Sequence, residues 1–257
     1  MTKLIIVLAT TLLSLVVSAQ VSENRTVSDF SSLKVATGVK VSYTISNSKS
    51  VLVETDDTEK LQFIKTEVEN GTLKIFIDNS DKNYKGSKKR LNNIHFNILK
   101  VTISGPSLNS FKASSSGQIK MENLNASNDL EIGASSSGSI SGKFKASTIN
   151  VDVSSSSKFK GDVDAKLVVL ESSSSAEIVI SGKADKITAN ASSSSSCNTK
   201  DLVVETAEVK ASSSANISVY ASKSLDAKVS SSATIFYYGN PTQVFADKSS
   251  SGSVSRK

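Results

Sequence analysis

Residues 130–178 read LEIGASSSGSISGKFKASTINVDVSSSSKFKGDVDAKLVVLESSSSAEI, and this stretch decides the fold. Apolar and polar residues alternate on both sides of each serine run. Such alternation is typical of strands, in which every second side chain faces the same side. A serine-rich linker would lack it. The stretch therefore predicts short strands separated by serine-rich corners.

The same unit recurs through the second half of the chain. One serine from each run forms a column whose successive steps are 21, 19, 19, 19, 20, 18 and 19 residues: Ser115, Ser136, Ser155, Ser174, Ser193, Ser213, Ser231 and Ser250. Four residues after each serine stands Ile119, Ile140, Phe159, Ile178, Cys197, Ile217, Ile235 or Val254. Units of this length cannot bury an apolar face alone, but stacking builds a continuous core. The sequence therefore predicts an all-β protein, a β-solenoid of about eight coils of 18–21 residues that carry a serine ladder.

Three positions in the repeat carry further expectations. We expect the serine column to turn inward at a corner, where small hydroxyls bond neighbouring backbone groups or the next serine. Cys197 stands in the Ile/Phe column, which predicts a buried small apolar residue. Lys248 replaces an inward Ala or Val in the last repeat only, as expected where a terminal repeat faces solvent.

The first part of the mature chain lacks the serine ladder. Residues 20–105 predict a β-rich N-terminal part that caps the solenoid of residues 106–257. Strands are expected at 35–45, 50–55, 63–68, 73–77 and 94–103, with a short helical turn over 56–62. The Asn70-Gly71 pair between two of these strands is typical of a tight hairpin.

Residues 1–19 have the pattern of a secretory signal peptide. Lys3 precedes the apolar stretch Leu4–Val17, and Val17-Ser18-Ala19 fits a cleavage site after Ala19. This apolar stretch is shorter than the roughly 20 residues that span a bilayer, so we expect no transmembrane segment after cleavage. The only cysteine is Cys197, so we expect no lipoprotein anchor. We expect an exported protein of the periplasm, the outer-membrane surface or the extracellular space.

Composition narrows the function classes. The 257 residues contain one Cys and one His, which excludes an internal disulfide framework, a multi-cysteine metal site and any site that needs two imidazoles. The net charge of +6 falls to +5 without the signal peptide and is spread along the chain. This weak charge does not support a nucleic-acid partner.

No set of residues indicates catalysis, a cofactor or a metal. His95 lies in an alternating run, out of phase with Ile94 and Phe96, and is expected to face solvent. A Ser-His-Asp triad would lack the Gly-x-Ser-x-Gly turn, and the paired carboxylates Asp56-Asp57 are typical of a surface turn. The acidic residues of the repeats form no repeated column, and the nonapeptide calcium repeat is missing. We therefore assign no catalytic, cofactor-binding or metal-binding residue.

One concentrated charge run lies in the first part of the chain. It contains Lys82, Lys85, Lys88, Lys89 and Arg90 beside Tyr84. A solvated loop explains such a run. The alternative is a basic contact loop for acidic glycans or lipid headgroups.

Several motifs together resemble a known family. They are FSSLKVATGVKV at residues 30–41, ENGTLKI at residues 69–75, and repeats of the type Ala-Ser-Ser-Ser-Gly-x-Ile. In this order, after a signal peptide, they resemble the putative auto-transporter adhesin, head GIN domain family over roughly residues 28–240. The resemblance implies an exported bacterial β-solenoid, and it implies no ligand and no catalytic residue. The chain departs from an autotransporter in having no room for a C-terminal membrane barrel.

Three hypotheses for function follow. The first is a non-catalytic exported interaction module with adhesin-like binding at the cell envelope, whose partner is a glycan or an envelope protein. The second is a polysaccharide-acting β-helix enzyme, a lyase or hydrolase, which needs carboxylates converging in a groove with Lys or Arg. The third is a self-assembling envelope scaffold that stacks through its ends, against which the basic residues Lys248, Arg256 and Lys257 argue.

Overall fold

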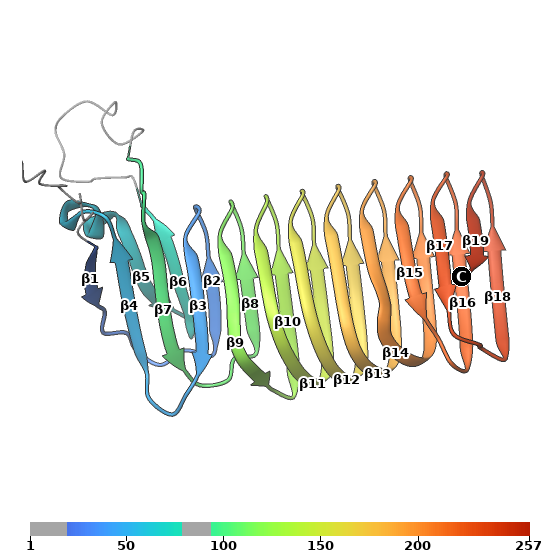
Figure 1. The fold of residues 1–257 in the computed structure, drawn as a ribbon, viewed down its shortest axis with the longest axis horizontal. Helices are drawn as coiled ribbons and strands as arrows, with labels where there is room; N and C mark the ends of the chain where they lie inside the picture. The colour runs from blue at the N-terminus through green and yellow to red at the C-terminus, as the bar shows by residue number, and fades with distance from the viewer. Residues whose placement is uncertain (1–19, 79–93) are drawn as a thin grey trace, which may run out of the picture.

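The computed structural model describes residues 20–78 and 94–257, which form a rod of stacked β-coils (Figure 1). The expected signal peptide of residues 1–19 lies outside the described residues. The strands are β1 (Val21–Asn24), β2 (Ser32–Val35), β3 (Lys40–Ile45), β4 (Ser50–Thr55), β5 (Ile64–Glu69), β6 (Thr72–Ile77), β7 (Leu99–Gly105), β8 (Ser110–Ala113), β9 (Gln118–Ala126), β10 (Asp129–Ala134), β11 (Ser139–Val153), β12 (Lys158–Ser172), β13 (Glu177–Ala191), β14 (Ser196–Ala211), β15 (Asn216–Tyr220), β16 (Ser224–Val229), β17 (Thr234–Tyr238), β18 (Gln243–Lys248) and β19 (Ser253–Arg256). A 3₁₀ helix, η1, spans Thr58–Phe63. The predicted all-β solenoid is confirmed.

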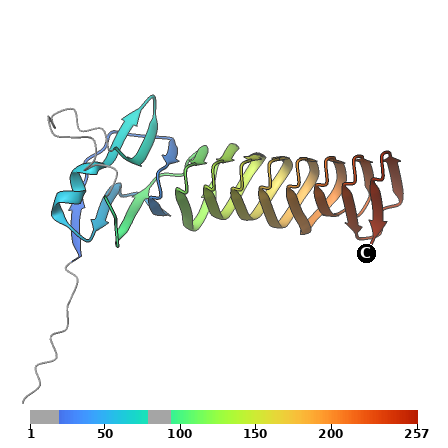
Figure 2. The ribbon, with the colours of Figure 1, turned by 90° about the horizontal axis from the view of Figure 1, so that it is seen from above.

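Each coil is flattened between two edges of the rod. A strand runs up to a serine turn at one edge, and the next strand runs back to a bend at the other edge (Figures 1 and 2). β11, β12 and β13 pair in parallel, with Ser139 opposite Lys158 and Lys158 opposite Glu177. The 19-residue repeat therefore places equivalent residues of successive coils side by side.

The predicted apolar columns fill the space between the two faces. Ile140, Phe159, Ile178 and Cys197 are at most 1% exposed, and Val254 in the last coil is 9% exposed. Their burial confirms the inward column that the spacing predicted. Removing this apolar area from water contributes about 25 cal/mol per Å² and is the main stabilising term of the rod.

The serine corners differ from the prediction in one respect. Ser174 and Ser175 are exposed, so the expectation that the serine column turns inward is wrong. In each turn the ladder serine and the serine after it have positive φ angles, 52° and 60° for this pair, which directs both side chains away from the core. The turns stack through their backbones. The Ser175 amide donates to the Ser193 carbonyl at 3.0 Å, and the equivalent bond joins each serine turn to the turn of the next coil.

The N-terminal part adds a coil and then covers it. β2 and β3 meet at a turn that contains Thr37 and Gly38, and they pair in parallel with β8 and β9. On their other side β2 pairs with β6 and β3 with β7. The antiparallel strands β4 and β5 then join β7 and β6, and β1 joins β4. The strand edges of this first coil are therefore covered.

Two expected strands of this part differ from the structure, and the other local predictions hold. The strand expected at 35–45 is interrupted by the turn at Thr37 and Gly38, so only Val35 and Lys40–Ile45 lie in strands. The β5–β6 hairpin turns at Asn70 and Gly71, both with positive φ, and η1 lies where a helical turn was expected. The strand expected at 94–103 begins only at Leu99, so its first part was wrong. Ile94, Phe96 and Ile98 are half-buried but lie outside regular structure, because their backbone pairs with no neighbouring strand.

An aromatic column ties the N-terminal part to the rod. Ring centroids lie 6.4 Å apart for Phe30–Tyr43, 6.3 Å for Tyr43–Phe111, 5.8 Å for Phe111–Phe144 and 5.9 Å for Phe144–Phe159. The first three pairs meet edge to face, which is a favoured geometry for aromatic rings. The Tyr43 hydroxyl donates to the Pro106 carbonyl at 2.7 Å, so this buried polar group is satisfied.

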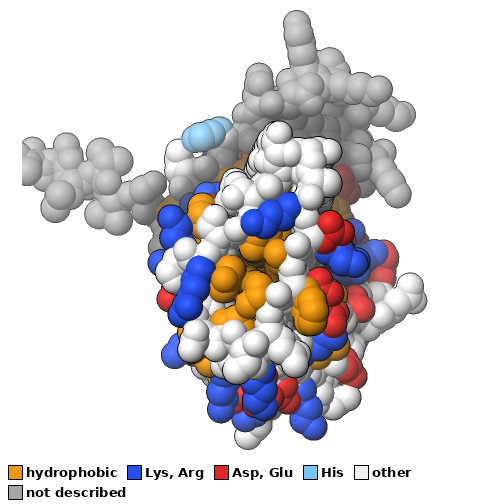
Figure 3. Space-filling view, turned by 90° about the vertical axis from the view of Figure 1, so that its right-hand side faces the viewer, with side chains coloured by type: hydrophobic (Ala, Val, Ile, Leu, Met, Phe, Trp, Pro, Cys, Tyr) orange, Lys and Arg blue, Asp and Glu red, His pale blue; other side chains and the backbone are white. Residues whose placement is uncertain are grey.

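The C-terminal end of the rod is open. Every residue of β18 is exposed, and apolar side chains are visible at the centre of this end (Figure 3). Val244 is 42% and Phe245 66% exposed. Lys248 stands where other coils bury Ala or Val, and its ammonium donates to the Val254 carbonyl at 3.1 Å. A charged side chain thus reaches from β18 to β19 at the last coil.

Candidate binding groove along the serine turns

A groove runs beside the serine turns on the face formed by β10–β14, β16 and β18. It encloses about 620 Å³ and extends from the coil of Asp152 to the coil of Asp247. Two rows of side chains line it: the first serine of each turn, and the outward residue two positions before that serine. The second row, here called the charged column, comprises Asp152, Glu171, Asn190, Lys210, Lys228 and Asp247.

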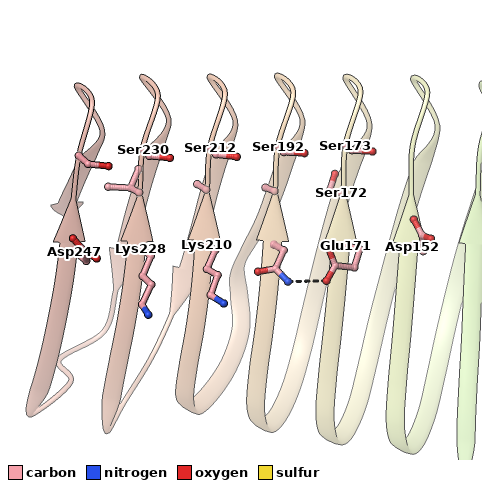
Figure 4. Close-up of a pocket in the computed structure, with 15 residues that line it drawn as sticks. Asp152, Glu171, Ser172, Ser173, Ser192, Lys210, Ser212, Lys228, Ser230 and Asp247 are labelled. Atoms are coloured by element: carbon pink, nitrogen blue, oxygen red, sulfur yellow. Dashed lines mark hydrogen bonds between the residues drawn. The ribbon is translucent and has the colours of Figure 1, made fainter.

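The serine row offers free hydroxyls at a regular spacing. Ser173, Ser192, Ser212 and Ser230 are half-buried, and their hydroxyls point the same way along the rod (Figure 4). Each backbone amide in this row bonds the preceding coil, as Ser212 does with the Ala191 carbonyl at 3.0 Å. Their side-chain hydroxyls have no hydrogen-bond partner within residues 20–78 and 94–257. Neighbouring hydroxyls are separated by one coil, about 4.8 Å.

The charged column places like charges side by side. Asp152 lies in register with Glu171 on the neighbouring strand, and Lys210 lies in register with Lys228. Asn190 separates the two pairs and donates to Glu171 at 2.7 Å. Like charges directly opposite one another destabilise a sheet. This column is therefore acidic toward β11 and basic toward β16.

Elsewhere on the rod, lysines and carboxylates of nearby coils form pairs. The distances between nitrogen and oxygen are 2.9 Å for Lys158–Glu177, 3.2 Å for Lys145–Asp164 and 2.7 Å for Lys186–Glu208. Lys210 and Lys228 form no ion pair among the described residues. The two lysines of the charged column thus differ from Lys145, Lys158 and Lys186, whose charges are paired.

No acidic residue of this face forms an ion pair with either lysine among the described residues, although Asp247 lies in register with Lys228 on the neighbouring strand. Glu208 and Asp226 lie two positions before the two lysines on the same outward face, but Glu208 is bound by Lys186. Asp226 forms no ion pair with any described residue. Figure 4 shows the side chains of Lys210 and Lys228 extending side by side, away from the serine row. Together they form a positively charged surface with hydroxyls on one side.

The residues singled out from the sequence fall in three places. The ladder residues lie at the exposed tips of the turns: Ser115, Ser136, Ser155, Ser174, Ser193, Ser213, Ser231 and Ser250. The last five of them directly follow serines that line the groove. The basic contact loop of Lys82, Lys85, Lys88, Lys89 and Arg90 lies outside the described residues. His95 is exposed and far in sequence from the groove.

Asp56 and Asp57 form a structural turn. Asp57 accepts a hydrogen bond from the Glu59 amide at 2.9 Å and so caps η1. The Lys60 ammonium lies 2.7 Å from Asp56, and this hydrogen bond holds the pKa of the Asp56 carboxyl well below its usual range. Asp56 also accepts from Asn97 at 3.0 Å. The pair thus stabilises the turn that joins β4 to η1.

Cys197 is buried, as its column predicted. Burial raises the pKa of its thiol to about 12. A thiol that stays protonated is neither a good nucleophile nor a metal ligand. Within the described residues, no group of three or more His, Cys, Asp or Glu side chains is placed to hold a metal ion.

The charged column can be read from the sequence, although the sequence analysis did not identify it. Aligning the residue three before each ladder serine gives Lys112, Gly133, Asp152, Glu171, Asn190, Lys210, Lys228 and Asp247. The expectation that the acidic residues of the repeats share no column is wrong for Asp152 and Glu171, which pair in register. The sequence alone does not show that these like charges are neighbours; the register of the stacked coils does.

The described residues thus form a regular β-solenoid with a groove along its serine turns. Residues 29–241 match the family described as putative auto-transporter adhesin, head GIN domain. The match spans most of the chain, and the protein belongs to this family, as the sequence motifs indicated.

Solved structures share this fold. A putative lipid binding protein from Parabacteroides distasonis is 24% identical, with a TM-score of 0.82 over 93% of this chain and 96% of that chain. A putative adhesin from Parabacteroides merdae is 16% identical, with a TM-score of 0.83 over 93% of this chain and 96% of that chain. At these identities the likeness shows the fold alone. A comparison with curated proteins finds no match.

Proposed function

We propose that this protein is a non-catalytic, exported interaction module that binds at the cell envelope in an adhesin-like manner. The observation that carries the proposal is the groove beside the serine turns, where unpaired hydroxyls and unpaired ammonium groups face solvent together. The adhesin description of the family agrees with a binding role. No described helix is long and apolar enough to cross a membrane.

Binding is tested with the purified, fluorescently labelled protein. We expect saturable retention on intact cells or envelope fragments and competition by unlabelled protein. The variant Ile178→Asp, in which a charge enters the buried column and prevents folding, is the unfolded control, because it keeps the composition and loses the groove. Retention that never saturates, or that the unfolded control matches, would contradict the proposal.

Export is tested separately. We expect the protein, expressed with a C-terminal epitope tag in a bacterial host, to leave the cytoplasm and to begin at Gln20 after processing. Fractionation followed by N-terminal sequencing measures both. An unprocessed protein that stays in the cytoplasm would overturn the exported assignment and leave the binding test unaffected.

One observation keeps a polysaccharide-acting enzyme as the second candidate. The groove holds two carboxylates, Asp152 and Glu171, together with Lys210 and Lys228, which is the residue set that such an enzyme needs. The carboxylates follow one another along the rod and lie on the same side of the groove, whereas glycosidases place theirs on either side of the scissile bond. Release of shortened products from a bound polysaccharide, abolished by Glu171→Gln, would favour the enzyme.

A further inference from the structure

We propose that the groove binds a linear acidic glycan laid along the rod, with an acidic group of one sugar held between Lys210 and Lys228. This inference rests on the proposed binding function and names its ligand. The hydroxyls of Ser212 and Ser230, in the same two coils, then bond the sugar hydroxyls. Acidic sugars here mean those that carry a carboxylate or a sulfate.

The two lysines need an anion. Their ammonium groups lie on neighbouring strands in register and neither is paired, so each raises the electrostatic energy of the other. One carboxylate or sulfate between them relieves this repulsion and accepts charge-assisted hydrogen bonds from both. The Glu208 carboxylate already lies 2.7 Å from the Lys186 ammonium. Asp247 is in register with Lys228 but forms no ion pair with it, and Lys210 has Asn190 on its other side.

The regular spacing of the serine row favours a sugar chain over a peptide. A ligand that follows the rod must repeat its contacts at each coil, about every 4.8 Å. An extended peptide advances about 3.3 Å per residue and falls out of step after one coil. A pyranose ring with its glycosidic bond has nearly the length of one coil, so successive sugars meet successive serines.

The groove also excludes binding by strand addition. Every strand that lines it between Asp152 and Lys228 pairs with a neighbour on both edges. No open edge is left there to which a peptide backbone could add as a further strand. The ligand must therefore be recognised by side chains, and the available ones are hydroxyl, ammonium and carboxylate groups.

The acidic half of the charged column adds specificity. Asp152 and Glu171 lie in the same groove and repel an acidic group placed over their coils. A glycan in which acidic and neutral sugars alternate places about half as many acidic groups over these coils as a glycan that is acidic on every sugar. The alternating chain is therefore repelled less and binds more tightly.

Isothermal titration with three oligosaccharides of equal length tests the inference. The probes are a hyaluronan fragment, which alternates acidic and neutral sugars, an oligogalacturonate, which is acidic throughout, and a neutral chitin fragment. We expect affinity to fall in that order. The double variant Lys210→Gln/Lys228→Gln should bind the hyaluronan fragment about 2–30-fold more weakly, as expected for the loss of two solvent-exposed ion pairs.

The matched control removes the same charge from the opposite face. Lys160 and Lys200 are exposed and form no ion pair with a described residue, so Lys160→Gln/Lys200→Gln lowers the net charge equally and should leave affinity unchanged. In the reverse direction, Asp152→Asn/Glu171→Gln should strengthen binding of the oligogalacturonate. Thermal unfolding of each variant confirms that the rod is intact.

Each remaining outcome overturns the inference in its own way. An equal loss in both lysine double variants would mean attraction by net charge alone. Saturable binding to cells without binding to any of the three glycans would refute the glycan and leave the proposed function standing. Shortened products from a bound probe would replace the binding groove by an active site.

Discussion

Two consecutive residues in each serine turn have a left-handed backbone. Outside glycine this conformation costs roughly 1–2 kcal/mol per residue, and Asn and Asp tolerate it better than other residues. The surrounding ladder holds the turn in place: Ser173 and Ser175 donate to carbonyls of the neighbouring coils, and Ala176 donates back to Ser173. These three hydrogen bonds hold the left-handed residues of the turn in a conformation that is strained on its own.

Ser174 provides a test of this strain at an exposed site. Ser174→Val should lower the free energy of unfolding by about 1–2 kcal/mol, because a β-branched side chain tolerates positive φ poorly. Ser174→Asn should be nearly neutral. Urea unfolding of the two variants measures the difference. Equal stability of Val and Asn would mean that the turn is not left-handed at this position.

Cys197 makes stability depend on alkaline pH. An unfolded thiol ionises near its ordinary pKa of 9.0, whereas burial raises the pKa of the folded thiol to about 12. The folded state therefore binds more protons between these values, so stability is full below pH 9 and falls as the pH rises toward 12. At pH 10 the loss from this group should be about 1 kcal/mol relative to pH 7.

The variant Cys197→Ala isolates this contribution. Burial also raises the pKa of Tyr43, which acts in the same direction, so the comparison is between the pH dependences of the two proteins. Urea unfolding at pH 7 and pH 10 should show a smaller change for Cys197→Ala. An identical change in both would show that the thiol ionises as easily in the folded state as in the unfolded chain.

The strand β13 carries the next test, because its two faces have opposite environments. Ile178 is fully buried, and Ile178→Ala should cost about 2–5 kcal/mol of stability. Ile178→Asp should prevent folding, because an unpaired charge enters an apolar column. Lys183→Gln should change stability by less than about 0.5 kcal/mol, since exposed ion pairs such as Lys183–Asp164 contribute little.

Circular dichroism and urea unfolding measure these three variants. If Lys183→Gln destabilises the protein as much as Ile178→Ala, the inward and outward faces of β13 are misassigned. The same comparison checks the alternation from which the fold was predicted, since Ile178 was assigned to the inward column from the repeat alone.

The success of that prediction has a physical cause. The repeat length fixes the coil-to-coil register, and the period of two fixes the inward face, so Phe159 and Ile178 could be placed without coordinates. The direction of the serines could not, because it depends on a left-handed turn for which Gly, Asn or Asp is the usual signal. The bend of β13 at Gly182, where φ is 112°, was equally hard to predict, because a single glycine within a strand does not specify a bend.

The groove was less predictable than the core. Each of Asp152, Glu171, Lys210 and Lys228 is an ordinary exposed residue within its own coil. Their significance comes from side-by-side placement in a stack, which requires the register to be known residue by residue. The hydroxyls that line the groove were recognised as a repeat, but not as a surface.

The whole rod has two unlike ends, and a stacked solenoid transmits stability mainly between neighbouring coils. At the N-terminal end, β6 and β7 cover the first coil, and β4, β5 and the aromatic column from Phe30 to Phe159 support it. At the other end β18 is fully exposed, and Lys248 is the side chain that reaches across to β19. Opening of this chain should therefore begin at the C-terminal coil.

Hydrogen exchange followed by mass spectrometry measures this gradient. We expect the least protection in β18 and β19, intermediate protection in β16 and β17, and the greatest in β11–β13, because each coil can open only after its outer neighbour has opened. Phe245→Lys, at an exposed site, should leave the order unchanged, whereas Ile235→Ala should lower protection of β17 through β19 and spare β11. Uniform protection along the rod would show instead that all coils unfold in one cooperative step.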